Sequence, residues 1–133
     1  METTAAGLDH VILTVSDYER ARAFYGDLLG FEVHQLAPEH GGLLFFQVGS
    51  TQIFLVRHDA TPPGDRFSEF RIGLDHLSFA APNEQALHEL EDTLIAAGVE
   101  TNGVELFAGH YPYIVFRDPD NIQLEYWYSP PGE

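Results

Sequence analysis

Two histidines in identical surroundings are the residues of this chain best suited to chemistry. The string Gly-Leu-Asp-His occurs at residues 7–10 and again at residues 73–76. Such a match would arise by chance only about one time in twenty, which favours an internal repeat. An apolar run and then a helical pattern ending at a glycine follow each copy. The repeat predicts two similar halves, each led by a histidine on a strand (His10 and His76), and one site built from both.

Glu125 adds a carboxylate to these two imidazoles. It lies in the apolar run 122–128, where a buried carboxylate is costly unless it is paired or binds a cation. Because side chains alternate along a strand, Gln123, Glu125 and Trp127 share one face. Two imidazoles and one carboxylate from three strands form a facial ligand set that suits Fe(II), Mn, Co, Ni or Zn. The open positions would bind a substrate oxygen or a water molecule.

Composition narrows the class of protein. The 133 residues, 44% of them hydrophobic, suffice for one domain with one sizeable core. The absence of cysteine excludes disulfides and thiolate metal sites. The net charge of −15, with six basic residues that are all arginine, argues against nucleic-acid binding and favours solubility or cationic ligands. No apolar run approaches the ~20 residues of a membrane span, and residues 1–7 do not resemble a signal peptide, so we expect a cytoplasmic protein without membrane contact.

The first half is expected to contain a strand, a helix and three further strands. A capping box at Ser16 and Glu19 starts the helix, and Gly30 ends it. Its apolar stripe is Ala21, Phe24, Tyr25 and Leu28. The predicted strands span residues 8–15, 31–36, 43–48 and 51–58.

The second half repeats this order after a linker at 59–72, which contains Pro62-Pro63-Gly64 and is expected to cross the surface. An alternative is a lid, with Phe67 and Phe70 folded inward over a pocket. Asn83 caps the next helix, Gly98 closes it, and its predicted buried stripe is Leu87, Leu90, Leu94 and Ala97. The strands are predicted at 74–81, 99–107, 111–117 and 122–128, with a turn at 118–121 in which Asn121 tolerates positive φ.

Each half is therefore expected to be a βαβββ unit. With this repeat and the motifs below, the sequence resembles the vicinal oxygen chelate superfamily. That superfamily includes glyoxalase I, methylmalonyl-CoA epimerase, extradiol dioxygenases, fosfomycin-modifying thiol transferases and bleomycin-resistance proteins. The resemblance extends from Leu8 to Tyr128. The segments that carry it are Asp9-His10-Val11, Ser16-Asp17, Phe24-Tyr25-Gly26-Asp27-Leu28-Leu29-Gly30-Phe31, Asp75-His76-Leu77, Phe116-Arg117-Asp118-Pro119-Asp120-Asn121 and Leu124-Glu125.

The resemblance implies an α+β fold in one domain spanning 1–133. Two tandem βαβββ modules, at 8–58 and 73–128, would form an open, cupped β-sheet barrel with the helices outside. It also implies a metal held by His10, His76 and Glu125. Many glyoxalases and epimerases have a fourth protein ligand, but the internal repeat aligns Phe54 with Glu125, and Phe cannot ligate. A register shift of two residues would instead make Gln52 the fourth ligand.

No single member of the superfamily matches fully. Val115 stands where the fosfomycin enzymes have a tyrosine, and cationic side chains are scarce. His110 and Tyr113 are candidates for an acid or base. If a cavity exists, aromatic residues line it and favour an apolar or aromatic substrate: Phe45, Phe54, Tyr113 and Trp127. Four other histidines are expected on the surface: His34, His40, His58 and His88.

Two functional hypotheses from different classes follow. The leading one is a divalent-metal-dependent enzyme acting on a small oxygenated substrate, either a glyoxalase-like lyase or isomerase or a ring-cleaving dioxygenase. The alternative is a non-catalytic protein that sequesters a cationic or aromatic drug, as bleomycin-resistance proteins do. The aromatic cavity candidates and the −15 charge fit this alternative, whereas the retained metal ligands favour an enzyme. We also expect a homodimer, in which paired subunits protect edge strands.

Overall fold

The computed structural model describes residues 2–132, which divide into two compact units. Unit 1 is Met1–Asp65 and unit 2 is Arg66–Glu133. The boundary falls inside the predicted linker 59–72, so each unit contains one copy of the Gly-Leu-Asp-His repeat.

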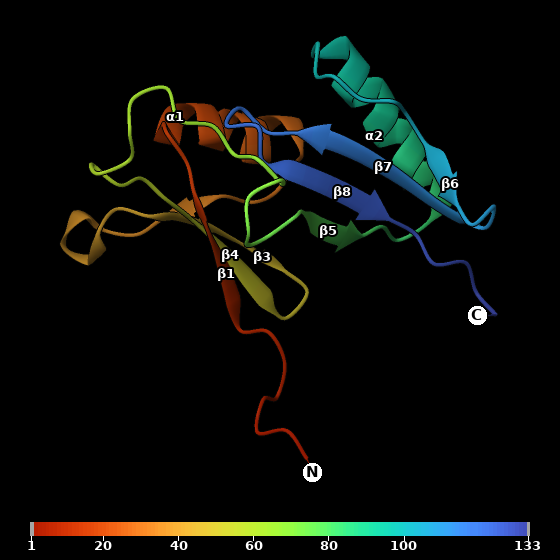
Figure 1. The fold of residues 1–133 in the computed structure, drawn as a ribbon, viewed down its shortest axis with the longest axis horizontal. Helices are drawn as coiled ribbons and strands as arrows, with labels where there is room; N and C mark the ends of the chain where they lie inside the picture. The colour runs from red at the N-terminus through yellow and green to blue at the C-terminus, as the bar shows by residue number, and fades with distance from the viewer. Residues whose placement is uncertain (1, 133) are drawn as a thin grey trace. The chain divides into compact units, whose positions relative to one another are not determined.

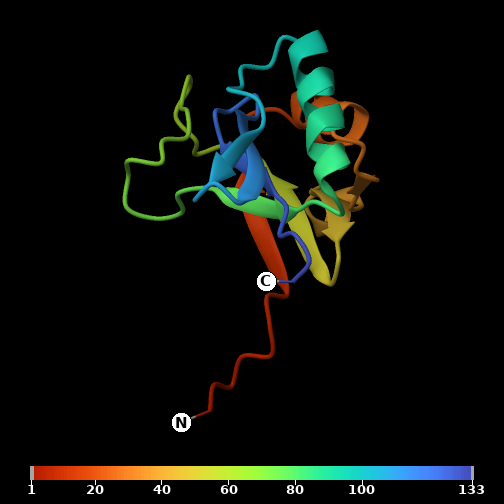
Figure 2. The same ribbon diagram turned by 90° about the vertical axis from the view of Figure 1, so that its right-hand side faces the viewer.

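Unit 1 has the predicted order of a strand, a helix and three strands (Figure 1). Its elements are β1 (His10–Thr14), α1 (Tyr18–Ala21), η1 (Arg22–Leu28), β2 (His34–Gln35), η2 (Pro38–His40), β3 (Leu44–Val48) and β4 (Thr51–Val56). The four strands form one sheet in the order β1-β4-β3-β2, with β1 parallel to β4. Residues preceding β1 extend away from this sheet (Figure 2).

Unit 2 repeats this topology. Its elements are β5 (Leu77–Ala80), α2 (Glu84–Ala96), β6 (Glu105–Phe107), β7 (Tyr111–Arg117) and β8 (Gln123–Trp127). The sheet order is β5-β8-β7-β6, and β5 runs parallel to β8. The prediction of two βαβββ modules is therefore confirmed.

Alternation along the strands separates a core face from an open face in each sheet. On β7, the core face holds Pro112, Ile114 and Phe116, which are buried, and α2 packs against this strand. The residues between them, including Tyr113 and Val115, are partly exposed. Unit 1 follows the same rule, since Leu44 and Phe46 of β3 are buried. The helix covers one face of each sheet because the apolar side chains of that face need a partner.

The helix starts and stops mostly follow their predicted signals. Asn83 caps α2 by accepting a hydrogen bond from the backbone N–H of Ala86 at 2.8 Å. Gly30 and Gly98 have φ of 87° and 72°, the left-handed conformation that ends a helix. The predicted cap of the first helix was wrong by one residue, because Asp17 accepts the Arg20 N–H at 2.9 Å. Unlike the predicted α-helix, Arg22–Leu28 forms a π-helix, in which the Leu29 N–H donates to the Phe24 carbonyl.

Every predicted strand except 111–117 is shorter in the structure, and β5 begins at Leu77, so His76 lies just before the strand on which it was predicted. Two strands lose several residues because helices bind part of their backbone. In the expected strand 31–36, the Phe31 N–H donates to the Tyr25 carbonyl, and β2 contains two residues. In the expected strand 99–107, the Val104 N–H donates to the Glu91 carboxylate of α2. The predicted buried stripe of α2 is correct for Leu87 and Leu94 but wrong for Ala97, the exposed C-cap.

The segment that begins unit 2 is bound to the turn between β7 and β8. The Phe67 N–H donates to the Asp120 carbonyl, and the Asn121 side chain donates to the Phe67 carbonyl. Asn121 has φ of 70°, which confirms the predicted turn. Phe70 is 92% exposed, so the alternative in which it folds inward is wrong.

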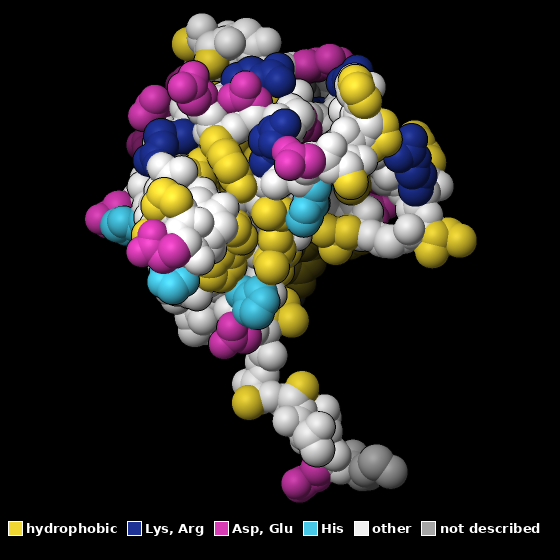
Figure 3. All heavy atoms as spheres, turned by 90° about the vertical axis from the view of Figure 1, so that its left-hand side faces the viewer, with side chains coloured by type: hydrophobic (Ala, Val, Ile, Leu, Met, Phe, Trp, Pro, Cys, Tyr) yellow, Lys and Arg dark blue, Asp and Glu magenta, His cyan; other side chains and the backbone are white. Residues whose placement is uncertain are grey.

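The described helices and the charged side chains on the surface are relevant to binding of membranes and nucleic acids. None of the helices within residues 2–132 combines the length and apolar character needed to cross a bilayer. On the face shown in Figure 3, arginine side chains are interspersed with acidic ones.

Phe46 gives a direct test of the unit 1 core. It is fully buried and stacks on Phe31 and Tyr25, with ring centroids 4.4 and 5.6 Å away. Replacing it with Ala leaves a cavity, so we expect Phe46→Ala to lower the free energy of unfolding in urea by about 3–5 kcal/mol. The matched substitution Phe70→Ala should change it by less than about 0.5 kcal/mol. Equal losses in the two variants would contradict this core.

Candidate functional site

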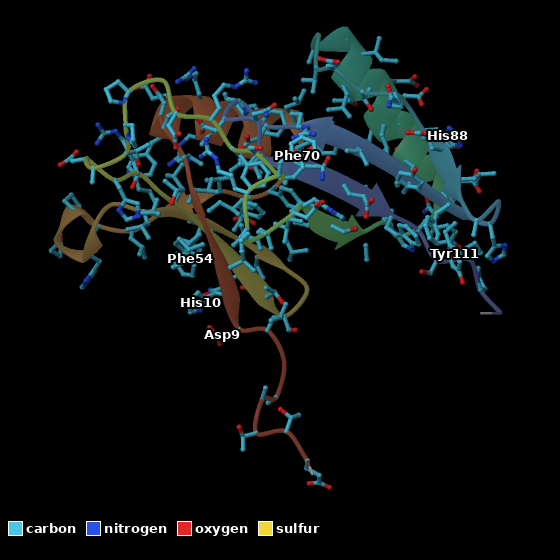
Figure 4. The ribbon with its side chains drawn as sticks, in the orientation of Figure 1. Asp9, His10, Phe54, Phe70, His88 and Tyr111 are labelled. Atoms are coloured by element: carbon cyan, nitrogen blue, oxygen red, sulfur yellow. The ribbon has the colours of Figure 1, made fainter. Side chains whose placement is uncertain are left out.

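His10 in unit 1 is held by the acidic residue that precedes it. Its Nδ1 lies 2.7 Å from Oδ1 of Asp9. Its ring meets Phe54 edge-on, with centroids 5.7 Å apart. Asp9, His10 and Phe54 lie next to one another at the sheet formed by β1 and β4 (Figure 4). Because a carboxylate only accepts hydrogen bonds, Nδ1 donates and Nε2 is available as a ligand.

His76 in unit 2 has the same arrangement and adds a second carboxylate. Its Nδ1 lies 2.6 Å from Oδ1 of Asp75, and its Nε2 lies 3.7 Å from Oε1 of Glu125. The parallel pairing of Ser78 with Glu125 directs the glutamate toward the face on which His76 stands. The Glu125 side chain is 12% exposed. Metal bonds to nitrogen and oxygen of ~2.0–2.2 Å would let one cation reach both atoms, so this donor pair fits a divalent metal.

Asp75 belongs to a longer series of polar contacts in unit 2. Gln123 donates to Oδ1 of Asp75 at 3.0 Å and accepts from Nη2 of Arg117 at 3.1 Å. Arg117 in turn binds both carboxylate oxygens of Glu69, at 3.0 and 2.7 Å. The hydrogen bond from Arg117 lowers the pKa of Glu69 from its usual 4.5 to about 2. The same contact raises the pKa of Arg117.

Aromatic side chains also lie on the open face of each sheet. In unit 1, Phe45 and Phe54 pair across the strands with ring centroids 5.6 Å apart. In unit 2, Trp127 stacks on Tyr111 and Tyr113 at 5.4 and 5.8 Å. These four predicted pocket residues, Phe45, Phe54, Tyr113 and Trp127, are all partly exposed. Each pair thus presents aromatic surface on the open face of its own sheet.

The neighbouring Tyr126 lies on the opposite face. It packs on Phe79 and Phe116. Burial raises its pKa, so this phenol keeps its proton.

Within unit 2, the structure brings some of the predicted site residues together. His76 and Glu125 face each other, and Tyr113 shares their open face through its pairing with Trp127. His110 is exposed in the connection before β7, edge-on to Tyr111. Neither unit, over its described residues, contains by itself a group of three His, Asp or Glu side chains that could hold a metal. The predicted ligand set, with His10 from unit 1, stays a prediction.

Other residues with site contacts were not identified from the sequence. Asp9 and Asp75 stand in both copies of the repeat, and that position was the signal that could have identified them. The contacts of Gln123 with Arg117 and of Arg117 with Glu69 had no comparable signal, since Glu69 lies 48 residues before Arg117. The four remaining histidines are exposed, as predicted: His34, His40, His58 and His88.

The sequence model of the Glyoxalase/Bleomycin resistance protein/Dioxygenase superfamily matches residues 7–126. The chain belongs to this superfamily. Its glyoxalase-like fold is shown by a crystal structure of the glyoxylase/bleomycin resistance protein/dioxygenase domain from Frankia sp. EAN1pec. That structure is 30% identical, has a TM-score of 0.84, and is covered over 96% of its length by 98% of this chain.

The chain is also similar to curated proteins. The uncharacterised protein YwkD of Bacillus subtilis (strain 168) is 29% identical over 125 residues, which are 89% of this chain and 93% of YwkD. The mitochondrial methylmalonyl-CoA epimerase of Bos taurus is 44% identical over 52 residues. That match covers 37% of this chain and 30% of the epimerase.

The strand register shows which residue of unit 1 corresponds to Glu125 of unit 2. β1 pairs His10 with Gln52 and Ile12 with Phe54, while β5 pairs Ser78 with Glu125. Ile12 lies two residues after His10, and Ser78 lies two residues after His76. Phe54, the partner of Ile12, is therefore the counterpart of Glu125, the partner of Ser78. The alignment without a shift therefore holds, and Gln52 corresponds to Gln123.

The contact between Glu69 and Arg117 predicts a pH-dependent coupling. Because folding lowers the pKa of Glu69, its stabilising contribution is present above about pH 4.5 and is lost as the pH falls to about 2. We expect a double-mutant cycle with Glu69→Gln and Arg117→Gln, measured by urea unfolding, to show favourable coupling near neutral pH that fades over this range. Coupling of the same size at pH 2 would contradict it. The other contacts of Arg117 contribute equally to both sides of the cycle, so they do not enter the coupling free energy between Glu69 and Arg117.

Proposed function

We propose that this chain is a divalent-metal-dependent enzyme that acts on a small oxygenated substrate, with His10, His76 and Glu125 as the metal ligands. The observation that carries the proposal is the 3.7 Å approach of His76 Nε2 to Glu125 Oε1 while Asp75 occupies Nδ1. Nitrogen and carboxylate donors suit Fe, Mn, Co, Ni or Zn. When bound, the metal would act as a Lewis acid on a substrate oxygen and stabilise developing negative charge.

The chain's own residues would orient the substrate and move its proton. Tyr113 and Trp127 on one sheet, and Phe45 and Phe54 on the other, offer flat apolar surface to the part of the substrate that does not react. Tyr113 is supported as the proton-transfer group because it shares the open face of Glu125 and pairs with Trp127. His110 is the second candidate, from the connection before β7.

Among reaction types, the lyase or isomerase class has more support than the ring-cleaving dioxygenase class. The likeness to methylmalonyl-CoA epimerase, 44% over 52 residues, favours removal of a proton next to a carbonyl group. Because one scaffold serves many reactions, the fold itself does not decide between these classes.

The rival function is the sequestration of a cationic aromatic drug without catalysis. The net charge of −15 and the stacking of Trp127 with Tyr111 and Tyr113 favour it, since aromatic faces attract cations. The homodimer and the cytoplasmic location remain predictions, and light scattering of purified protein tests the first.

Metal content separates the two functions. Protein loaded with Fe, Mn, Co, Ni or Zn and then desalted should retain about one ion of one of these metals per chain by elemental analysis. His10→Ala, His76→Ala and Glu125→Gln should each lose it. The matched control is His88→Ala, whose imidazole faces Glu84 on α2 at 3.4 Å and should leave the metal in place. Wild-type protein that retains no metal but binds an aromatic cation would overturn the enzyme in favour of the rival.

Proton transfer is tested with substrates of different chemistry. A panel of hemithioacetals, α-substituted thioesters, catechols and epoxides is incubated in D₂O and followed by NMR. We expect deuterium exchange next to the carbonyl of one of the first two classes, and a fall in kcat of about 100-fold in Tyr113→Phe because an acid–base group is lost. If Tyr113 transfers the proton, His110→Gln should keep kcat within about twofold of wild type. That change is much smaller than the loss expected when an acid or base is removed. Turnover of catechols instead would contradict the isomerase class.

A further inference from the structure

Both candidate histidine ligands have the same contact on the nitrogen that faces away from the proposed metal. Asp9 holds Nδ1 of His10 at 2.7 Å, and Asp75 holds Nδ1 of His76 at 2.6 Å. The glycines that precede these pairs, Gly7 and Gly73, have φ of 145° and 143°. A side chain would meet no atom within 4 Å at either glycine, so the backbone conformation is what favours glycine there. The repeat thus preserves a local conformation together with a side-chain contact.

A carboxylate beside an imidazole selects one of its two neutral forms. The ionised carboxyl group has no hydrogen to donate, so the ring must donate from Nδ1. The neutral ring then has its lone pair on Nε2, and in His76 this is the nitrogen that faces Glu125. Outer contacts of this kind orient metal-binding imidazoles and raise their basicity.

The contact in unit 2 is reinforced by three further side chains. Gln123 spans Asp75 and Arg117, donating to one and accepting from the other. Arg117 binds Glu69 through two parallel hydrogen bonds, a geometry that restricts its guanidinium group. Glu69 is also partly buried, with 17% of its side chain exposed. The series therefore connects the segment before β5 to His76 through consecutive hydrogen bonds.

We propose that Asp9 and Asp75 are positioning residues that keep His10 and His76 in the Nδ1–H form, and that Glu69, Arg117 and Gln123 hold Asp75 in place for this role. The proposal rests on the proposed metal site, because it states how the chain prepares two of its ligands. It adds residues that touch neither the metal nor the substrate. Its consequence is that His76 is oriented before the metal arrives.

The form of each ring is measured on metal-free protein. Long-range ¹H–¹⁵N correlation of the histidine rings, under alkaline conditions in which histidine is neutral, distinguishes Nδ1–H from Nε2–H. Wild type should show Nδ1–H at His10 and His76. Asp75→Ala should shift His76 toward Nε2–H and leave His10 unchanged, and Asp75→Asn should restore Nδ1–H because the amide oxygen still accepts. Nε2–H in wild type, or no change in Asp75→Ala, would overturn the proposal.

Zinc affinity, measured by competition with a chelator, gives a second readout. Loss of an outer contact typically weakens metal binding about 10–100-fold, and we expect this of Asp75→Ala. Gln123→Met should produce a smaller loss and a partial change of the His76 ring. The matched control is Glu84→Ala, which removes a carboxylate that faces His88 on α2, and it should change neither readout. Asp9→Ala repeats the test in unit 1, so a folding defect in one unit does not decide the result.

The two readouts separate this proposal from the proposed function. If wild type has both Nδ1–H rings but binds no metal, the metal-dependent function fails and the positioning by the carboxylates stands. If wild type binds zinc and Asp75→Ala alters neither ring form nor affinity, the positioning fails and the metal site stands.

Discussion

The parallel pairing of the first and last strands of each module is the constraint on which the candidate site depends. In unit 2 this register sets Ser78 beside Glu125 and Leu77 beside Leu124. A slip of one residue would turn Glu125 toward the core and expose Leu124, which is now fully buried. Burying Leu contributes about 1.5–3 kcal/mol, and burying an unpaired carboxylate opposes the slip further. Core packing therefore decides where the carboxylate of Glu125 points.

The same constraint acts in unit 1 with a different side chain at the decisive position. There Phe54 takes the place that Glu125 has in unit 2, and it contacts His10 edge-on. One module thus offers an imidazole with a carboxylate, and the other offers an imidazole with an aromatic ring. Since the backbone topology of the two sheets is identical, the chemical difference between them comes from side chains on their open faces. This agrees with a superfamily in which one scaffold serves many reactions.

The series of polar contacts that ends at His76 restricts the orientation of its imidazole ring. The series begins at Glu69, and each later side chain, from Arg117 through Gln123 to Asp75, has a partner on both sides. Arginine suits the central place because its planar group binds a carboxylate with two hydrogen bonds and still has another N–H to donate. An imidazole held by such a series loses little further freedom when it binds a ligand.

The sequence alone was sufficient to predict the two βαβββ modules, the superfamily, and the positions of His10 and Glu125 on strands, whereas His76 lies one residue before β5, the strand on which it was predicted. These features are local or repeated: the two-residue alternation, the Asn83 cap, the glycines that end helices, and the duplicated Gly-Leu-Asp-His string. The tertiary structure decided the shortened strands β2 and β6, whose neighbouring backbone is bound by helices, and the π-helix at Arg22–Leu28. It also decided the contact of Glu69 with Arg117. Contacts between residues 48 apart depend on how the chain packs, and neither composition nor periodicity encodes which distant partner a side chain meets.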